Sequence, residues 1–555
     1  MGGARLRLFR PALPALAVLV PTALVAWHGS VYGSWIVEDA GVAFAYARSI
    51  ATGAGAVPQP GAEPVEAFTS PVWLALHVVG RWSGSFDRGT WFGVPDYVAF
   101  PKALGVLTAV AVFAGFHRAA KAVTSHPALV TLVAGALLAA VPSYVVWTVS
   151  GLENGLLAAA AVWLVAVMLP AVVDGRLLTP RVAVWCGLLA ALAALTRADG
   201  VVYLAAYPLV ALGLLRRGEL RQVGRAVGIS VGAFAVPFVA SVVWRLVTFG
   251  TVLPGSAVTD LHGPLDIGVV VAWFDLVGYL AWPVVAAAVV IVVVAVAHRP
   301  ADGVPARRPL GAVLVPFGLA GTGYLLLQPD WMEHLRFASS IWAVGALLIV
   351  LCALRVVAIV RARRAVLVGG GVAVAVAVVA SAPSTVGAAL DFGDYPSAPL
   401  CVAVEQTGRT VNAYQALVAA PEPTLLASDL GGAALTGTSR IVDLSGAADA
   451  HIAGFWARED WTAFGDYVFA TVRPTFVKGS EYTMSETGLG ADPRLERDYV
   501  EIASDKDLTD WVRRDALRGP AQLDELRTLA ETRLQPAVDE ARNAGGASCG
   551  DRLTP

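Results

Sequence analysis

The chain has 555 residues, of which 57% are hydrophobic and only 15% are charged, and its formal net charge is −2. Soluble domains average about 45–50% apolar and about 25% charged residues, so this composition excludes an ordinary soluble protein and indicates a membrane protein. We expect the lipid bilayer as a partner and expect no nucleic-acid partner.

Long apolar segments follow one another along the N-terminal two thirds of the chain. A helix that crosses a bilayer core of about 30 Å needs ~20 mostly apolar residues. Eleven segments are predicted as transmembrane helices, near 11–27, 100–116, 127–147, 155–171, 183–195, 201–215, 226–246, 274–297, 310–327, 337–354 and 365–382. The first also fits a signal peptide, but the many later spans favour an uncleaved helix. The segments near 183–195 and 201–215 are short, so we expect them to be tilted or partly re-entrant.

The distribution of Lys and Arg among the loops predicts the orientation of these helices. Cytoplasmic loops carry an excess of Lys and Arg. With the N-terminus inside, the short outer loops hold almost no basic residues except Arg197 and Arg336. The inner loops then hold Arg118, Lys121, Arg176, Arg181, Arg216, Arg217, Arg221, Arg225, Arg299, Arg307, Arg308, Arg361, Arg363 and Arg364. We expect a multi-pass plasma-membrane protein with a cytoplasmic N-terminus and an extracytoplasmic C-terminal region.

Two predicted domains follow from this topology: a transmembrane domain at residues 1–382 and an extracytoplasmic domain at residues 383–555. The first outer loop, residues 28–99, contains the apolar segment Ser70–Gly80. This segment is too short to span, and counting it as a span would place Arg118 and Lys121 outside. We therefore predict that it is an interfacial helix on the membrane surface.

The C-terminal region is predicted to be a small α/β domain, because polar and charged residues return there. A helical stretch from Gln522 to about Ala541 has leucines at helical spacing, so one face is expected to pack against the rest of the domain. Strand-like pieces occur at Thr424–Ala427, Arg440–Leu444 and Thr475–Lys478, and the spaced leucines are Leu523, Leu526 and Leu529.

Four cysteines are present. Cys186 and Cys352 lie inside apolar segments and are predicted to be inert. Cys401 and Cys549 bracket the C-terminal region and are candidates for one disulfide bond if that region lies in an oxidising compartment.

Carboxylates dominate the predicted outer loops, close to the ends of the helices. A single ionisable residue at a helix end is often only a water-facing cap. The set as a whole favours a functional site, because ionisable residues at the membrane boundary are costly unless they are paired or lie in a wet cavity. The outer-loop candidates are Glu38, Asp39, Glu63, Glu66, Glu153, Asp199, Asp260, Asp330 and Glu333, with Arg197, His334 and Arg336 among them.

Glycosyl transfer is a reaction that suits these groups. A carboxylate can take the proton of an acceptor hydroxyl as that hydroxyl attacks an anomeric carbon. A phosphate leaving group needs cations, and Arg197 and Arg336 are the candidates for them. A lipid-phosphate donor would also explain the membrane location, since its hydrophobic tail must reach the site from the bilayer.

A divalent cation is an alternative use of one acidic group. Asp330, Glu333 and His334 place three possible ligands within five residues. No fixed metal spacing is matched, so we expect no cofactor and leave a cation at these residues as the alternative.

At several motifs the sequence resembles the GT-C type polytopic glycosyltransferases that use polyprenyl-phosphate sugars. It is most similar to the actinobacterial terminal β-(1→2) arabinofuranosyltransferase family. The resemblance covers roughly residues 1–345, and more loosely 441–453. It rests on Glu38-Asp39-Ala40, Phe44–Arg48, Gly53–Gly55, Pro60-Gly61, Val65–Trp73, Ser150-Gly151-Leu152-Glu153-Asn154, Thr196–Gly200, Phe249-Gly250 with Leu253-Pro254, and Asp330–Met332 before Arg336-Phe337.

The resemblance implies a GT-C fold and an inverting transfer in which an acid of the first outer loop is the base. Relatives usually carry an Asp-Asp pair there, and Glu38 replaces the first Asp. Asp39 is therefore the predicted base, with Glu38 orienting it or the acceptor. Gly255 stands where relatives often have Asn, which leaves the donor or the acceptor open. The residues predicted to bind the substrate or donor are Arg48, Glu66, Glu153, Asn154, Arg197, Asp199, His334 and Arg336.

The predicted function is transfer of arabinofuranose from decaprenyl-phosphoryl-arabinose to a cell-wall polysaccharide, such as arabinogalactan or lipoarabinomannan, during cell-wall biogenesis. Three alternatives stay open: another polyprenyl-phosphate sugar such as mannose, a membrane transporter, and a non-catalytic sugar- or lipid-binding receptor. A transporter commonly shows inverted repeats and charged binding groups near the bilayer midplane, and the sequence shows neither.

Overall fold

The computed structural model describes residues 12–216, 218–252, 267–298, 308–327, 332–361, 363–418, 420–505, 508–544 and 548–553. The chain forms two compact units, which we describe separately. The helical unit comprises Met1–Tyr32, Lys102–Trp244 and Asp260–Gly393, and the α/β unit comprises Gly33–Pro101, Arg245–Thr259 and Asp394–Pro555. The first outer loop thus belongs to the same compact unit as the C-terminal region.

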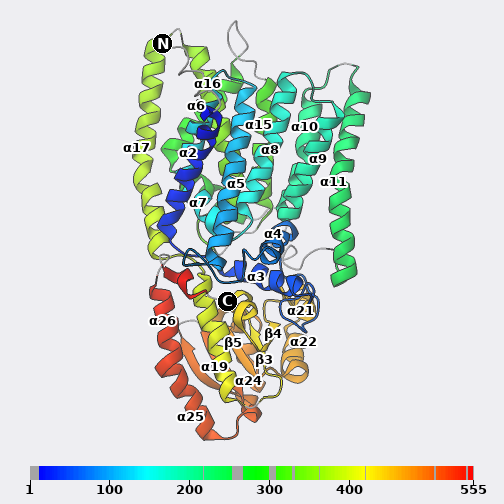
Figure 1. The fold of residues 1–555 in the computed structure, drawn as a ribbon, viewed down its shortest axis with the longest axis vertical. Helices are drawn as coiled ribbons and strands as arrows, with labels where there is room; N and C mark the ends of the chain where they lie inside the picture. The colour runs from blue at the N-terminus through cyan, green and yellow to red at the C-terminus, as the bar shows by residue number, and fades with distance from the viewer. Residues whose placement is uncertain are drawn as a thin grey trace. The chain divides into compact units, whose positions relative to one another are not determined.

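The helical unit consists of long apolar helices (Figure 1). Seven helices of the described residues are long and apolar enough to cross a membrane, and two bent helix pairs raise the number to nine if each pair is one span. This composition makes the chain a multi-pass membrane protein. The seven are built on α2 (Ala12–Gly29), α5 (Asp96–Lys121), α8 (Asn154–Val173), α11 (Leu220–Phe249), α15 (Gly311–Leu326), α16 (Ser339–Val360) and α17 (Arg364–Asp394).

Both bends have a cause in the sequence. Pro142 begins the second half of one pair, and a proline near the start of a helix disfavours helical backbone in the residue before it. That pair, α6 (Pro127–Ala139) and α7 (Pro142–Val149), bends by 82°. The second pair, α13 (Ile267–Tyr279) and α14 (Trp282–Ala297), bends by 94° at Ala281, whose φ is +64°.

Two shorter apolar helical segments complete the helical unit: α9 (Pro180–Thr196), and η2 (Ala198–Ala205) with α10 (Ala206–Gly213). Each of the eleven predicted segments therefore coincides with a long helix, a bent pair or a short apolar helix. Small residues allow the helices to pack closely, as is common in membranes. A Cβ atom at Gly105 would collide with the carbonyl oxygen of Thr148, and one at Gly187 with that of Ser230.

The first outer loop contains two helices and a short hairpin. The helices are α3 (Glu38–Ala51) and α4 (Pro71–Trp82), and the hairpin joins β1 (Thr90–Trp91) to β2 (Val94–Pro95). Ser70 caps α4, because its side chain accepts a hydrogen bond from the amide of Trp73 and Pro71 follows it. The helix predicted near 70–80 is confirmed, and its place at the membrane surface stays a prediction.

A five-stranded sheet forms the centre of the C-terminal part of the α/β unit. The strand order is β4-β3-β5-β7-β6, with β3 parallel to β4 and β5 and the remaining pairs antiparallel. The three predicted strands are confirmed, whereas the sequence analysis did not identify β6 and β7. The strands are β3 (Thr424–Ala427), β4 (Arg440–Asp443), β5 (Phe476–Ser480), β6 (Tyr499–Asp505) and β7 (Leu508–Arg513).

Alternate residues of β3 pack into two different apolar clusters. Leu426 packs with Val442 and Val477, and Leu425 packs with Phe476 and Leu526. Leu526 lies in the predicted helical stretch, which is helical and is buried at that leucine. The helices of this region are α18 (Leu400–Ala403), η5 (Val404–Arg409), α19 (Thr410–Leu417), α20 (Leu430–Thr436), α21 (Ala450–Arg458), α22 (Trp461–Asp466), η6 (Tyr467–Val472), α23 (Glu481–Glu486), α24 (Pro493–Asp498), α25 (Pro520–Leu529), η9 (Ala530–Leu534) and α26 (Gln535–Asn543).

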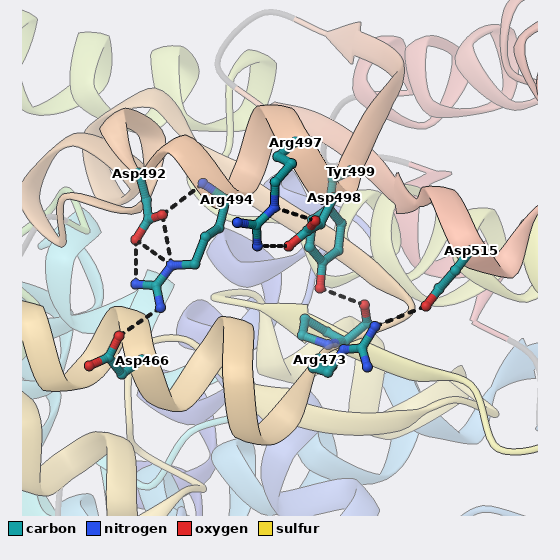
Figure 2. A network of polar contacts seen from close by, with 9 residues as sticks. Asp466, Arg473, Asp492, Arg494, Arg497, Asp498, Tyr499 and Asp515 are labelled. Carbon is teal, nitrogen blue, oxygen red and sulfur yellow. Dashed lines mark hydrogen bonds and ion pairs between the residues drawn. The ribbon is translucent and has the colours of Figure 1, made fainter.

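A network of ion pairs and hydrogen bonds links side chains of this region (Figure 2). Arg494 contacts Asp492 at 2.7 Å and Asp466 at 2.6 Å, and its guanidinium lies 5.3 Å from the centre of the Phe469 ring. Hydrogen bonds to Arg494 hold the pKa of Asp492 below its ordinary value. These contacts tie α24 to the end of α22 and to η6. Exposed pairs stabilise proteins by only about 0–1 kcal/mol, so we assign the network a local structural role.

A disulfide bond joins Cys401 to Cys549 across 148 residues, with 5.5 Å between the Cα atoms. The other two cysteines, Cys186 and Cys352, are free and buried. The disulfide brings the C-terminal end of the chain to the start of α18. The amide of Gly550, next to Cys549, donates a hydrogen bond of 2.9 Å to the Ser34 side chain. The segment around the disulfide therefore also fixes the residues that precede α3.

Candidate functional site

Glu38 and Asp39 form the first turn of α3. Carboxylates are stabilised at a helix N-terminus, where the backbone amides and the helix dipole present positive charge. Asp39 is exposed and Glu38 is half-buried. The predicted base is thus open to solvent, and its neighbour points into the α/β unit.

The Glu38 side chain is hydrogen-bonded to Asp429, which begins α20. Burial raises the pKa of Glu38 well above 4.5, and the nearby charge of Asp429 raises it further. Burial also raises the pKa of Asp429. Asp429 accepts hydrogen bonds from the Thr407 hydroxyl at 2.6 Å and from the Gly432 amide at 3.0 Å. Two carboxyl groups can bond to each other in this way only when they hold a proton between them.

Glycines allow α3 and α20 to approach closely enough for this contact. A Cβ atom at Gly41 would lie 2.7 Å from the carbonyl oxygen of Gly431. In turn, a Cβ atom at Gly431 would collide with the carbonyl oxygen of Glu38. The backbones of the two helices are therefore in contact next to Glu38 and Asp429, whose carboxyl groups form the pair.

Glu66 forms an ion pair with Arg245. The Arg245 Nε atom lies 2.9 Å from both carboxylate oxygens, and both residues are buried. Burial raises the pKa of Glu66, while the hydrogen bond and the charge of Arg245 lower it. Arg245 could not be predicted from the sequence, because it lies inside an apolar helix and no motif marks it.

Arg48 holds the first outer loop together. Its guanidinium donates to Asp87 at 2.9 and 3.0 Å and to the carbonyl oxygen of Leu435 at 2.9 Å, and it contacts Tyr97. Arg81 also pairs with Asp87. These contacts give Arg48 a structural role, and its predicted part in donor binding stays a prediction.

Arg197 lies between two carboxylates of the helical unit. Its Nε atom is 2.9 Å from Asp199, and its Nη1 atom is 3.5 Å from Glu153. All three residues are buried. Arg197 ends α9, Asp199 lies in η2, and Glu153 precedes α8, so three helix ends supply one charged cluster.

A second arginine shares an aromatic ring with Arg197. The Arg197 guanidinium lies 4.4 Å from the centre of the Phe337 ring, and the Arg336 guanidinium lies 4.8 Å from the same ring. Each distance is within the range of a cation–π contact. Two cations that would repel each other are thus held against one half-buried side chain. Both arginines were predicted from the sequence, and Phe337 appeared there only as part of a motif.

Residues 334–336 are fixed by side chains from neighbouring helices. The Asn154 side-chain amide donates to the carbonyl oxygen of Arg336 at 2.6 Å, and the Trp147 indole donates to that of His334 at 3.0 Å. His334 and Leu335 both have positive φ, +61° and +51°. Such backbone is costly for residues other than glycine and persists where the surroundings enforce it, which is often at functional sites.

His334 is held by aromatic side chains. Its Nδ1 atom is 2.8 Å from the Tyr279 hydroxyl, its ring packs on Phe392 at 4.8 Å, and burial lowers its pKa. Within the described part of the chain no three His, Cys, Asp or Glu side chains form a group that would hold a metal ion. Asp330 of the cation alternative lies outside the described residues, as do Asp260, Gly255 and the Leu253-Pro254 motif.

The predicted site residues fall into two groups. One group belongs to the α/β unit and contains Glu38, Asp39, Arg48 and Glu66. The other belongs to the helical unit and contains Glu153, Asn154, Arg197, Asp199, His334 and Arg336. Within the second group the structure brings Glu153, Arg197 and Asp199 into direct contact and places Arg336 on the same ring as Arg197.

Similarity to solved structures defines the fold class. No protein-family model matches the chain, and no curated protein matches its sequence. The chain has the GT-C fold, a bundle of membrane helices with a C-terminal α/β region.

Three of the similar structures are these. ArnT from Cupriavidus metallidurans, bound to undecaprenyl phosphate, has a TM-score of 0.55 at 15% identity, over 91% of this chain and 99% of ArnT. The oligosaccharyltransferase of Archaeoglobus fulgidus, tethered to an acceptor peptide, has a TM-score of 0.53 at 13% identity, over 91% and 74%. A mutant of the arabinofuranosyltransferase AftD from Mycobacteria has a TM-score of 0.50 at 16% identity, over 90% of this chain and 41% of AftD.

Proposed function

We propose that the chain is an inverting glycosyltransferase that takes a sugar from a polyprenyl phosphate and transfers it to a polysaccharide acceptor outside the plasma membrane. The observation that carries the proposal is the contact of Arg197 and Arg336 with one ring, that of Phe337. Guanidinium groups bind phosphate through two parallel hydrogen bonds, and two of them held in place suit a phosphate that gains charge as it leaves.

In the proposed reaction Asp39 accepts the proton of the acceptor hydroxyl. The hydroxyl oxygen then forms a bond to the anomeric carbon, and the bond between that carbon and the phosphate oxygen breaks. The electron pair of the broken bond leaves with the lipid phosphate, whose negative charge the two arginines stabilise. Attack on the face opposite the leaving group inverts the anomeric configuration, as it does in inverting glycosidases.

Glu153 and Asp199 have a different part in this proposal. Their carboxylates hold Arg197 by ion pairs at 3.5 and 2.9 Å, so the guanidinium is already oriented before the donor binds. Such preorganisation avoids the cost of arranging the charge during the reaction. Asn154 acts in the same way on Arg336, through its hydrogen bond to the backbone of that residue.

The lipid-phosphate donor is supported by what similar folds bind. The ArnT structure contains undecaprenyl phosphate, and the oligosaccharyltransferase AglB from Archaeoglobus fulgidus has been solved with a dolichol-phosphate. For the sugar we propose arabinofuranose, with decaprenyl-phosphoryl-arabinose as donor and a cell-wall arabinan as acceptor. The motif resemblance supports this choice, and the fold likeness to AftD agrees with it.

The proposed orientation places the N-terminus in the cytoplasm and the C-terminal region outside. The alternation of basic inner loops with short outer loops that hold almost no Lys or Arg supports it. The disulfide between Cys401 and Cys549 also favours an oxidising compartment for the C-terminal region.

The experiment is a transfer assay with the purified protein in detergent or nanodiscs. Polyprenyl-phosphate arabinofuranose and polyprenyl-phosphate mannose are supplied separately with a short arabinan acceptor, with and without a chelator. We expect arabinose to be added and lipid phosphate to be released at equal rates in both conditions. Transfer of mannose without transfer of arabinose would show that the sugar is mannose and not arabinofuranose. Binding of either donor without release of lipid phosphate would contradict the enzymatic function.

A further inference from the structure

The N-terminus of α3 is fixed by three contacts with the C-terminal region. The amide of Glu38 donates to the carbonyl oxygen of Ala398 at 2.8 Å, and the amide of Leu400 donates to that of Ile36 at 2.9 Å. The third contact is the side-chain bond between Glu38 and Asp429. The first two contacts fix the backbone, and only the third contact carries charge.

The position of Asp429 in the sheet explains why this third contact is placed here. Asp429 follows β3, the strand from which the chain crosses to β4 on one side and later to β5 on the other. In open α/β sheets the crevice at the carboxyl ends of such strands is where ligands usually bind. In this protein a side chain of α3, that of Glu38, contacts Asp429. The sheet therefore presents its usual binding position to the predicted catalytic helix.

The surroundings of the pair decide which partner is charged. Thr407 and the amide of Gly432 donate hydrogen bonds to Asp429, and the positive charge of Lys478 on β5 also favours its ionised form. Burial and the charges of Asp429 and Asp39 disfavour the ionised form of Glu38, and together they outweigh the helix N-terminus on which Glu38 lies. The single proton therefore resides on Glu38, which donates it to Asp429.

Other charged groups on the packed elements are paired elsewhere. On η5, Arg409 pairs with Glu405 at 2.5 Å. On α4, the His77 ring bonds to the carbonyl oxygen of Trp73 and Arg81 pairs with Asp87. Lys478 is also bonded to Asp510 at 2.5 Å.

We propose that Asp429 is a positioning residue for the transfer reaction: it shares one proton with Glu38, keeps Glu38 neutral beside Asp39, and so fixes the helix turn that carries the base. This inference rests on the proposed function, because it assigns Asp39 as the base. It gives the C-terminal region a part in the reaction that does not require contact with sugar.

The first test measures stability against pH and needs no activity. Because the folded-state pKa of Glu38 is raised, the folded protein keeps a proton that the unfolded chain loses above about pH 4.5. The pair therefore destabilises the fold increasingly as the pH rises from about 4.5 toward the raised pKa. In Asp429→Asn, the amide donates to an ionised Glu38, and this pH-dependent loss shrinks. In Glu38→Gln, the amide takes the place of the protonated carboxyl group and donates to the ionised Asp429, so no shared proton remains and the loss shrinks in the same way.

We compare the melting temperature of each variant with that of the wild type at pH 4.5 and at pH 8. Between these two pH values the difference should change in favour of each variant by about 2 °C or more. Asp515→Asn is the control, since Asp515 is an exposed acid paired with Arg473 in the same unit, and its curve should run parallel to that of the wild type. Parallel curves for wild type, Asp429→Asn and Glu38→Gln would overturn the shared proton. Having two variants keeps the test decisive if one of them does not fold.

The second test measures coupling in the transfer assay. Glu38→Asp and Asp429→Glu each change the reach of one carboxyl, and each should lower kcat by roughly 10–100-fold with little change in the donor KM. The double variant restores the combined length, so it should recover most of the rate. Additive losses would contradict the positioning role. If neither the variants nor the wild-type protein transfers sugar, the proposed function is contradicted. The stability test would still show whether Glu38 and Asp429 share a proton.

Discussion

The guanidinium of Arg197 lies 4.4 Å from the centre of the Phe337 ring, on which Arg336 also packs, at 4.8 Å. This relationship turns two arginines that are far apart in the sequence into one group. It also makes the ring, which has no charge of its own, responsible for the spacing of the two charges. Phe337 is therefore the residue at which the phosphate-binding hypothesis can be tested with least disturbance of charge.

Phe337→Leu should weaken donor binding. A cation–π contact contributes about 0.5–2 kcal/mol, so the loss of two such contacts should raise the donor KM by roughly 5–50-fold with a smaller change in kcat. Phe337→Trp keeps the aromatic face and is the matched control. The measurement is initial transfer rate against donor concentration. Equal donor KM values for Phe337→Leu and Phe337→Trp would show that the ring does not organise the arginines.

Replacing Glu66 by Gln should destabilise the α/β unit. The substitution leaves Arg245 as a buried charge without its carboxylate, which typically costs about 3–5 kcal/mol. Thermal unfolding at pH 7 should therefore show a clearly lower midpoint. Glu422→Gln, at an exposed position of the same unit, should not shift it. An unchanged midpoint in Glu66→Gln would mean that the pair contributes nothing to stability.

The disulfide should stabilise the residues before α3 as well as the C-terminal end. Cys549→Ser opens a loop of 148 residues and is expected to cost about 2–4 kcal/mol. Reductant should lower the melting temperature of the wild type to that of the variant and have no effect on the variant. The double variant Cys401→Ser/Cys549→Ser should behave like the single one. A wild type whose melting temperature resists reductant, although its thiols are shown to be reduced, would exclude this role.

The first outer loop should contact lipid through its exposed apolar side chains. Phe92 at the tip of the hairpin is fully exposed and Trp82 at the end of α4 is 67% exposed, and the chain enters the spanning helix α5 a few residues later. A fluorophore on Phe92→Cys should show blue-shifted emission in nanodiscs and quenching by nitroxide lipids. Tyr482→Cys, at a residue that is 74% exposed, is the aqueous control. Equal, water-like emission at both positions would rule out an interfacial loop.

Hydropathy predicted the helices of the membrane region from the sequence, because membrane helices are marked by length and composition. Three strands and the helical stretch around Leu526 were also recognisable. The sequence did not predict Asp429, Arg245 or the contact with Phe337. Asp429 is separated from its partner by almost four hundred residues, Arg245 is one charge in an apolar helix, and Phe337 is an ordinary aromatic residue beside a charged motif. Each gains its role only through folding.

The bends in two of the predicted spans could not be predicted from hydropathy either. The segments 127–147 and 274–297 each look like one continuous span, and the structure bends them by 82° and 94°. Pro142 marks the first bend in the sequence. The second requires positive φ at Ala281, a conformation that no sequence pattern predicts for alanine.

The central claim, that an acid of α3 activates the acceptor, is tested most directly by Asp39→Asn. Asparagine keeps the size of the side chain and cannot accept the proton. The transfer of sugar from a polyprenyl phosphate to arabinan should fall by at least about 100-fold, while membrane insertion and melting temperature match those of the wild type. Transfer by Asp39→Asn at the wild-type rate would contradict the account and remove Asp39 as the base.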